Sequence, residues 1–484
     1  MCKDERKKED LRDEGKLALE TISRQLKLAV LGATVAGIIS GIHGVASGIM
    51  VPSLTEGSNS MHITTNQESW IASLGVFAAP IAALIAGPIV DYFGRKLGMQ
   101  LCLLFYGVGF STMALARDVT HIYVGRTLCA VGEGFGPYYV TYLTEICTER
   151  QRSTVLWIAV TISAVLGETT VFIMDAFLIW NVSFLLFSLT CLIMMFYIHF
   201  ILVESPQWLF FVGRKEDAKC SLRILGKNES ALLQEIEYLK QVPPCKLTLM
   251  LNPTVWKPLG IITSVFFIQC MTGIYCIQYY TMEFVDSIGT SYNSLTVSTL
   301  VFSVKFIAVC TVGCYCIAVM DRKLALALSG FWMGVFSVTL AIYEYVYRES
   351  PMNERPYQWF VICLVVLHTI SSTFGVIDIP QILCGELFPM QARGVMMSFG
   401  TVILYFIMFF SIQSYNTCLA SLKIFGCLLL YGSFAFIMCC YSLFVLPETQ
   451  NKSLLTIQKS FIPTRREEFK SSQIQLQTIE EMQV

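Results

Sequence analysis

The stretch TFGVIDIPQILCGELFPMQARG, residues 373–394, places a carboxylate, Asp378, inside a long apolar run that ends in the charged residues Glu386 and Arg393. A charged side chain at depth in a bilayer is costly and faces the interior of a helix bundle or a water-filled cavity rather than lipid. Either this run lies outside a membrane, or Asp378 faces something other than lipid. The composition of the whole chain decides between these two possibilities.

The composition is that of a membrane protein with many spans. The chain has 484 residues, of which 55% are hydrophobic and 14% charged, whereas a soluble domain has about 25% charged residues. The mean hydropathy is +0.60. A helix of about 20 apolar residues crosses about 30 Å of hydrocarbon, and twelve such runs can be drawn, at about 28–51, 69–90, 98–116, 120–143, 154–174, 179–203, 257–284, 293–320, 324–346, 357–384, 395–414 and 421–446. We predict an all-α polytopic membrane protein with twelve transmembrane helices, in which Asp378 faces a central cavity.

A polar interruption divides the twelve runs into two groups of six. We predict a cytosolic N-terminal extension at 1–27, a six-helix bundle at 28–203, a cytosolic helical linker at 204–256, a second six-helix bundle at 257–446 and a cytosolic tail at 447–484. Within the linker, residues 216–240 have the pattern of short amphipathic helices. Lys and Arg gather in the loops on one side, and the opposite loop at 52–68 has none, which predicts that both termini are cytosolic.

The two halves carry matching charged motifs at corresponding places. GPIVDYFGRK (87–96) follows the second run and MDRK (320–323) follows the eighth, while TEICTERQRS (144–153) follows the fourth and GELFPMQARG (385–394) follows the tenth. A parallel repeat of this kind is typical of transporters that rock two bundles about a central site. We predict that the acids and bases at these ends form an inner gate, made of Asp91, Arg95, Lys96, Glu145, Arg152, Glu204, Arg322, Glu386, Arg393 and Glu448. Solvated ion pairs contribute little free energy, so they can break on each cycle; the alternative is that these residues only fix topology and helix ends.

The charged motifs of the two halves resemble those of the sugar porter family of the major facilitator superfamily. Further stretches that carry the resemblance, in this order along the chain, are GRTLCAVGEG, VESPQWL, GIYCIQYY and PETQNKSL. Within that family, the resemblance is closest to the insect-type facilitated trehalose transporters. It covers residues 28 to 460. It implies a twelve-helix major facilitator fold whose central solute site opens alternately to either face, a sugar such as trehalose or hexose as the solute, no cofactor, and a place in the plasma membrane.

The resemblance also implies a sugar site built from Gln, Asn and Trp side chains, and here the sequence departs from the family. It keeps Gln269, and Tyr279 at the outer end of the seventh run. At the other expected positions stand Val160, Cys270, Tyr275, Gln381, Leu404 and Tyr405, and His43 stands where facilitators often have Asn. The candidate substrate-binding residues are Gln269, Tyr275, Tyr279, Asp378, Gln381, His43 and Tyr405.

Further charged residues within the apolar runs should face the bundle interior. Lys305 is expected to snorkel or to pair with a carboxylate such as Glu283 or Asp378, and Arg126 is a candidate partner for Glu133. Glu168 is expected to face the interior of the N-terminal bundle. Pro380 removes a backbone donor and disfavours helical geometry at the residue before it, which predicts a local break in the tenth helix.

The function that these features favour is facilitative transport of a small solute through the lipid bilayer. The sequence has no Ser-His-Asp arrangement, no metal-ligand spacing and no Walker-type phosphate loop, and its net charge of -1 gives no indication of nucleic-acid binding. We therefore predict a protein that is not an enzyme and has no cofactor. Because most of the family's sugar ligands are replaced, two alternatives stay open: a proton-coupled or non-sugar transporter, and a non-transporting sensor derived from a sugar porter.

Overall fold

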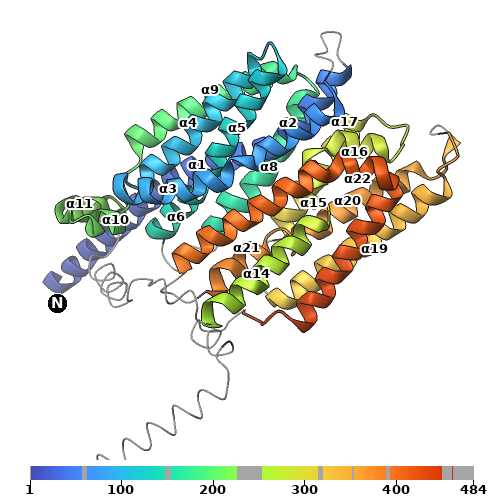
Figure 1. Cartoon of the computed structure of the whole chain (residues 1–484). Coiled ribbons are helices and arrows are strands. Elements are labelled where there is room, and N and C mark those ends of the chain that lie inside the picture. The colour runs from blue at the N-terminus through green and yellow to red at the C-terminus, as the bar shows by residue number, and fades with distance from the viewer. Residues whose placement is uncertain are drawn as a thin grey trace, which may run out of the picture.

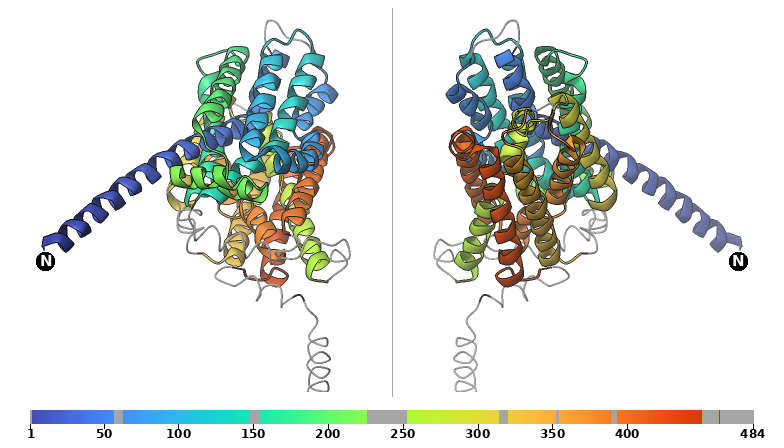
Figure 2. Two further views of the ribbon diagram at one scale, coloured as in Figure 1. Left: turned by 90° about the vertical axis from the view of Figure 1, so that its left-hand side faces the viewer. Right: turned by 90° about the vertical axis from the view of Figure 1, so that its right-hand side faces the viewer.

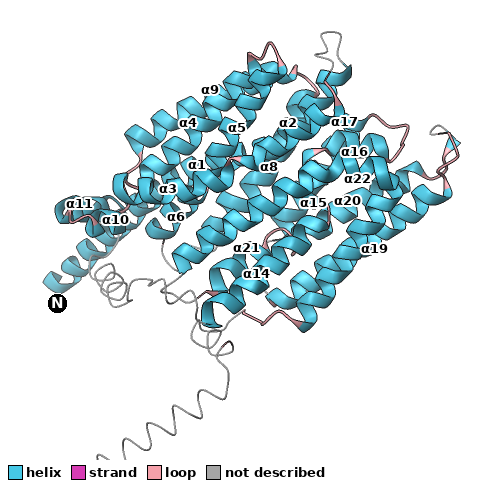
Figure 3. Ribbon diagram, in the orientation of Figure 1, coloured by secondary structure: helices cyan, strands magenta, loops and turns pink. Residues whose placement is uncertain are grey.

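A computed structural model describes residues 2–56, 63–147, 154–225, 253–313, 320–351, 354–388, 393–449 and 461. Every regular element within these ranges is a helix (Figure 3). The N-terminal half contains α1 (Cys2–Glu56), α2 (Thr65–Phe77), α3 (Ala79–Phe93), α4 (Arg95–Ala114), α5 (Val119–Phe135), α6 (Pro137–Ile146), η1 (Trp157–Ile162), α8 (Ser163–Asp175) and α9 (Trp180–Ile201). Two short helices, α10 (Pro206–Phe211) and α11 (Lys215–Leu225), follow it.

The C-terminal half repeats this all-helical plan. Its elements are α14 (Pro253–Met271), α15 (Ile274–Tyr279), α16 (Thr281–Ser287), α17 (Ser294–Ala308), η2 (Val309–Gly313), α19 (Arg322–Val346), α20 (Gln358–Thr373), α21 (Ile379–Leu387) and α22 (Arg393–Phe444). The amphipathic linker helices expected over 216–240 begin with α11, and the rest of that prediction lies outside the described residues.

The described helices account for the twelve expected runs. Eight are long and apolar enough to cross a membrane, and one of these, Val395–Phe444, is 50 residues long. It holds two runs, because Lys423 leaves helical geometry with φ 59°. The three remaining runs are interrupted helices: α5 with α6, α14 with α15 and α16, and α20 with α21. In the last of these, α20 ends at Thr373 and α21 begins at Ile379 with Pro380 in its first turn, which confirms the predicted break.

The two bundles lie side by side along their lengths (Figures 1 and 2). Each half has its own apolar core. A few residues of one half pack into the core of the other half, and they show where the halves meet. Phe302 of α17 joins the core of the N-terminal half, and Ala72 and Val76 of α2 join that of the C-terminal half. The contact surfaces between the halves include α8 against α17, α2 and α3 against α22, and α1 against α15 and α16.

Helix α1 packs on α8 at a distance that only glycine allows. A Cβ atom at Gly41 would lie 1.9 Å from the carbonyl oxygen of Ala164, and one at Gly167 would lie 2.0 Å from that of Ile38. Small residues at a crossing let two membrane helices pack backbone against backbone. This crossing places His43 of α1 and Glu168 of α8 in the middle of the molecule.

Candidate functional site

The predicted gate residues of the N-terminal half gather where α4 begins. Gly94, the residue before α4, has φ 114° and provides no side-chain cap. Glu204 supplies the missing acceptor: its Oε1 accepts hydrogen bonds from the backbone N–H groups of Arg95 (3.1 Å) and Lys96 (3.2 Å). The N-terminus of a helix favours a carboxylate at this position. Burial nevertheless raises the pKa of Glu204, while the N–H donors of Ser205, Lys96 and Arg95 act in the opposite direction.

The Arg95 side chain connects two further acids of the predicted gate. Its Nη1 lies 2.7 Å from Asp91 Oδ1, and its Nε lies 3.1 Å from Glu145 Oε1. Glu145 also accepts a hydrogen bond from the Ser205 hydroxyl. Lys96 donates its Nζ to the carbonyl of Leu202, 2.9 Å away. These contacts fasten the ends of several helices of the N-terminal half to one another.

The C-terminal half repeats this cap. Glu448 accepts hydrogen bonds from the backbone N–H groups of Arg322 (3.2 Å) and Lys323 (3.1 Å) at the start of α19. The hydroxyl of the next residue, Thr449, donates to Glu386 Oε2 at 2.6 Å. We call the end of the molecule that carries Glu204 and Glu448 the motif end.

The two caps match residue by residue. Glu204 and Glu448 cap corresponding helices, and the residue after each, Ser205 or Thr449, donates to the acid of the corresponding motif. The internal repeat seen in the sequence is therefore also a repeat of hydrogen bonds. Of the other two predicted gate residues, Arg152 lies outside the described residues, and Arg393 is described only as the first backbone position of α22.

A carboxylate in the middle of the bundle joins the two halves. Glu133 of α5 accepts hydrogen bonds from Ser40 (2.9 Å) and Tyr106 of its own half, and from the hydroxyl of Tyr405 (2.9 Å) on α22. Tyr405, a predicted substrate-binding residue, is thus placed against the other half. The expected pairing of Glu133 with Arg126 is not formed.

Arg126 instead binds backbone carbonyls and is fully buried. Its Nε donates to the carbonyl of Ile71 (2.9 Å), its Nη2 to that of Ala72 (3.2 Å) and its Nη1 to that of His43 (3.1 Å). The prediction was wrong because α2 presents carbonyls to this guanidinium at a crossing where Gly75 has no side chain. A Cβ atom at Gly75 would lie 2.1 Å from Arg126 Nη2.

His43 and Tyr279 lie around Arg126 and are buried. The His43 Nε2 atom is 2.8 Å from the carbonyl of Gly75, and its Nδ1 is 3.4 Å from Arg126 Nη1. Because a carbonyl only accepts and a guanidinium only donates, the hydrogen of the imidazole is on Nε2. The guanidinium lies 5.7 Å from the centre of the Tyr279 ring. The imidazole of His43 is therefore hydrogen-bonded to the neighbouring helix α2.

A buried ion pair forms a second connection between the halves. Lys305 Nζ of α17 lies 2.7 Å from Glu168 Oε2 of α8, and the two side chains are 4% and 6% exposed. Gln278 donates its amide to the other oxygen, Glu168 Oε1, at 2.6 Å. The expected partners of Lys305, Glu283 and Asp378, are therefore wrong for this state, because α8 brings Glu168 to the face of α17 that carries Lys305.

The remaining predicted binding residues meet near the break in the tenth helix. Gln269 donates its Nε2 to the Tyr275 hydroxyl (3.1 Å) and to the carbonyl of Ile377 (3.2 Å). Asp378 Oδ1 accepts a hydrogen bond from Thr161 (3.4 Å). Two acceptors here are buried without a hydrogen-bond partner in the described part of the chain, Gln269 Oε1 and Asp378 Oδ2. Gln381, in the first turn of α21, is exposed.

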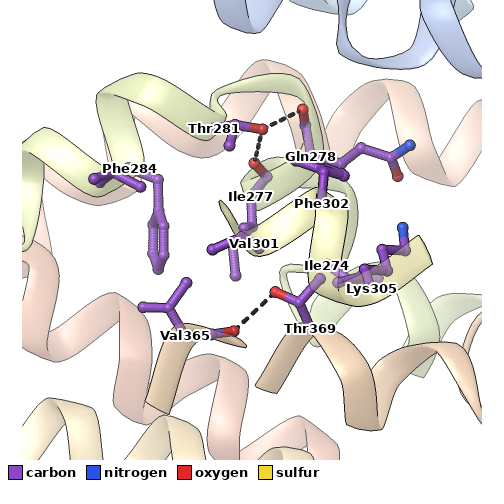
Figure 4. Close-up of a pocket in the computed structure, with 11 residues that line it drawn as sticks. Ile274, Ile277, Gln278, Thr281, Phe284, Val301, Phe302, Lys305, Val365 and Thr369 are labelled. Carbon is purple, nitrogen blue, oxygen red and sulfur yellow. Dashed lines mark hydrogen bonds between the residues drawn. The ribbon is translucent and has the colours of Figure 1, made fainter. Parts of the chain in front are cut away.

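A small cavity lies beside Lys305 and Gln278, within the C-terminal half (Figure 4). Its volume is about 20 Å³, room for about one water molecule, so it does not hold a sugar. Phe284, Val301 and Val365 point into it, whereas the polar ends of Lys305 and Gln278 point to one side, away from these apolar residues. The cavity therefore belongs to the packing behind Lys305 rather than to a solute site.

Comparison with known proteins places this geometry in a family. The family described as sugar (and other) transporter matches residues 28–461. The chain belongs to this sugar transporter family. Among similar proteins, the facilitated trehalose transporter Tret1 of Apis mellifera ligustica is 24% identical over 451 residues, covering 91% of this chain and 89% of that protein. Tret1 of Bombyx mori is 24% identical over 428 residues, covering 86% and 83%.

Solved structures of similar fold are sugar transporters as well. The partially occluded inward-open conformation of the xylose transporter XylE from E. coli has a TM-score of 0.73 at 14% identity, covering 89% of this chain and all of that chain. The proton:xylose symporter XylE bound to 6-bromo-6-deoxy-D-glucose has a TM-score of 0.71 at 16% identity, covering 91% of this chain. This likeness confirms the major facilitator fold. Membership of the sugar transporter family makes the chain an integral membrane protein and a transporter rather than an enzyme.

Sequence reasoning about this sugar transporter family member missed several partners in the middle of the bundle. Thr161, Gln278 and Ser40 were not singled out, although each is a polar residue inside an apolar run. That signal alone selects too many residues, because Ser and Thr in membrane helices also bond to their own backbone, as Ser163 does to the carbonyl of Ala159.

Proposed function

We propose that this protein carries a sugar across the membrane by facilitative, alternating-access transport, with trehalose and hexoses as the first substrates to test. The motif end faces the cytosol in this proposal, both termini are cytosolic, and the protein resides in the plasma membrane. Support for the solute class comes from the Tret1 and XylE proteins, which are described as transporting trehalose and xylose.

The observation that carries the proposal is the pair of free acceptors near the break in the tenth helix. A buried acceptor without a donor is unfavourable, and Gln269 Oε1 and Asp378 Oδ2 are both in this position. The orientation of the Gln269 amide is fixed, because its Nε2 donates to the carbonyl of Ile377. Sugar hydroxyl groups are donors that would satisfy both atoms, and the Tyr275 hydroxyl, which accepts from Gln269 Nε2, can also donate.

Uptake of radiolabelled trehalose, glucose and other sugars into proteoliposomes tests the proposal. We expect saturable flux for at least one sugar and a KM about 2- to 13-fold higher in Gln269→Leu, because a net hydrogen bond to a neutral group contributes about 0.5–1.5 kcal/mol. Ser264→Ala is the matched control on the same helix, since among the described residues the Ser264 hydroxyl bonds to the carbonyl of Gly260 alone. Wild-type protein without saturable flux for any sugar would refute the proposal, and binding without flux would favour the sensor.

Proton-coupled uptake is a second candidate, and the free Oδ2 atom of Asp378 favours it because a carboxylate in this position can take up a proton. Flux measured with and without an inward proton gradient separates the two candidates. Coupling predicts that the gradient drives accumulation in the wild type and not in Asp378→Asn. Equal flux with and without the gradient, in both proteins, would leave facilitative transport as the function.

A further inference from the structure

The ion pair of Glu168 and Lys305 crosses the boundary between the two halves. Glu168 lies on α8 and Lys305 on α17, and both side chains are almost completely buried. Gln278 of the C-terminal half donates to the same carboxylate. Any movement that separates α8 from α17 therefore takes one carboxylate away from two donors at once.

Asp378 is a second carboxylate close to this pair, and it lies on the same half as Lys305. Asp378 accepts a hydrogen bond from Thr161, which lies on the same span, Thr154–Asp175, as Glu168, and Lys305 and Glu168 are the charged groups that interact with it. Asp378 precedes α21 at the cap position, but its side chain makes no capping hydrogen bond. Among the described residues its one hydrogen-bond donor is Thr161, at a long 3.4 Å, and its Oδ2 is buried without a partner.

We propose that Lys305 changes its carboxylate during the transport cycle, from Glu168 in the state described to Asp378 when the halves part at the end opposite the motif end. The proposal rests on the alternating-access transport proposed above. Lys305 and Asp378 belong to one rigid half and keep their proximity when that half rotates, whereas Glu168 leaves with the other half.

The reason for such an exchange is the cost of leaving a buried charge alone. Removing one partner from a buried pair is strongly destabilising, because an uncompensated charge remains in a low dielectric. If Lys305 had only Glu168, opening would strip an ammonium group of its only counter-charge. Asp378 gives it a counter-charge in both states. The structure thereby assigns Asp378 a role as the positioning partner of Lys305, in addition to any contact with the sugar.

Thermal unfolding of the purified protein tests the exchange without any need for flux. In Glu168→Gln, Lys305 can turn to Asp378, and in Asp378→Asn it keeps Glu168, so each single variant should lose only a small part of Tm. The double variant leaves Lys305 without a carboxylate, and its loss should exceed the sum of the two single losses. Losses that simply add would overturn the proposal.

A second buried ion pair serves as the control for this cycle. Arg355 Nη1 lies 3.1 Å from Glu344 Oε2, with side chains 9% and 3% exposed, and both residues belong to the C-terminal half. Combining Glu344→Gln with Asp378→Asn should give additive losses of Tm, because Asp378 is not a reserve partner for Arg355. An excess equal to that of the Glu168 pair would mean that Asp378→Asn destabilises the fold in general, and would also overturn the proposal.

Sugar flux then separates the role of Asp378 toward Lys305 from a role toward sugar. In the wild-type background, Asp378→Asn should lower Vmax at least 10-fold. In a background with Glu168→Gln and Lys305→Gln, which has no charge to exchange, the same change should alter Vmax less than 2-fold, and any remaining effect should be on KM. Equal Vmax losses in both backgrounds would refute the exchange, whereas absent flux in the wild type would refute only the proposed function, since the unfolding cycle still decides on the exchange.

Discussion

Replacing Gly41 with alanine should force α1 and α8 apart and weaken the fold at its central crossing. The new Cβ atom would lie 1.9 Å from the carbonyl oxygen of Ala164, where ordinary contacts begin at 3.4 Å. The neighbour is backbone and cannot turn aside as a flexible side chain would. One of the two helices must therefore shift by about the difference between these distances, against close packing on every side.

The size of the effect follows from two opposing terms. Overpacking of this kind costs about 1–3 kcal/mol, while alanine in place of glycine within a helix returns about 0.5–1 kcal/mol. Gly260 on α14 provides the matched control, because a Cβ atom there would have nothing within 4 Å. Gly260→Ala should keep the helical gain alone. The two variants should therefore differ by about 2 kcal/mol in the free energy of unfolding.

Thermal unfolding of the purified protein in detergent, followed by intrinsic tryptophan fluorescence, measures this difference. We expect Gly41→Ala to unfold several degrees below the wild type and Gly260→Ala at or slightly above it. Sugar uptake should fall in Gly41→Ala even where the protein is folded, because α8 carries Glu168 and its displacement disturbs the pair with Lys305. Equal unfolding temperatures for the two variants would show that the α1–α8 crossing is not packed as described.

Three further predictions concern single contacts. Tyr405→Phe removes the hydroxyl that donates across the halves to Glu133. It should lower the free energy of unfolding by about 1.5–3 kcal/mol, the range for hydrogen bonds to charged groups. Thermal unfolding measures this loss, with Tyr292→Phe, whose side chain is half-exposed, as the control. Burial raises the pKa of Glu204 above 4.5, so the folded state binds this proton more tightly than the unfolded chain. The contribution of this group to stability is therefore fully present below its unfolded pKa and is lost as the pH rises through its folded pKa, a slope that should be smaller in Glu204→Gln. Asn181, in the sequon Asn181-Val-Ser183, lies in the first turn of α9 and donates to the carbonyl of Ala114 at 3.0 Å. We therefore expect it to carry no glycan, so treatment with a glycosidase should leave the electrophoretic mobility of the protein unchanged.

The twelve spans could be predicted because a span depends on local sequence, about 20 apolar residues in a row. The two caps could not, because Glu204 lies 109 residues from Arg95 and Glu448 lies 126 residues from Arg322. The sequence marked both acids only as charged residues of the gate motifs. The break before α21 follows from one residue, Pro380, whose ring excludes a regular helix.

The partners in the middle of the bundle could not be predicted, because they depend on how each helix is rotated. A membrane helix that is apolar all round has no polar stripe to show which face is buried. Lys305 therefore had Glu283 and Asp378 as candidate partners, and the rotation of α8 and α17 selected Glu168 instead. Likewise, no sequence pattern shows that Gly75 lets Arg126 reach the carbonyls of α2.

The caps and the contacts between the halves have different parts in an alternating cycle. Every partner of Glu204 and of Glu448 described above belongs to the same half as the acid, so the caps survive any rotation of one half against the other. We infer that these two acids hold helix ends rigid, which is one of the two interpretations that the sequence left open for the gate residues.

The bonds that must change are those between the halves, and several lie away from the motif end. Ser47 donates to the carbonyl of Tyr279 (2.7 Å), and Ser73 donates to Gln413 (2.6 Å). Such hydroxyl bonds are individually weak and can open one after another. The Glu168–Lys305 pair cannot open so easily, because a buried charge that loses its partner is strongly destabilising. Opening this interface therefore carries the free-energy cost of separating that pair, unless a second carboxylate pairs with Lys305. We propose Asp378 as that carboxylate.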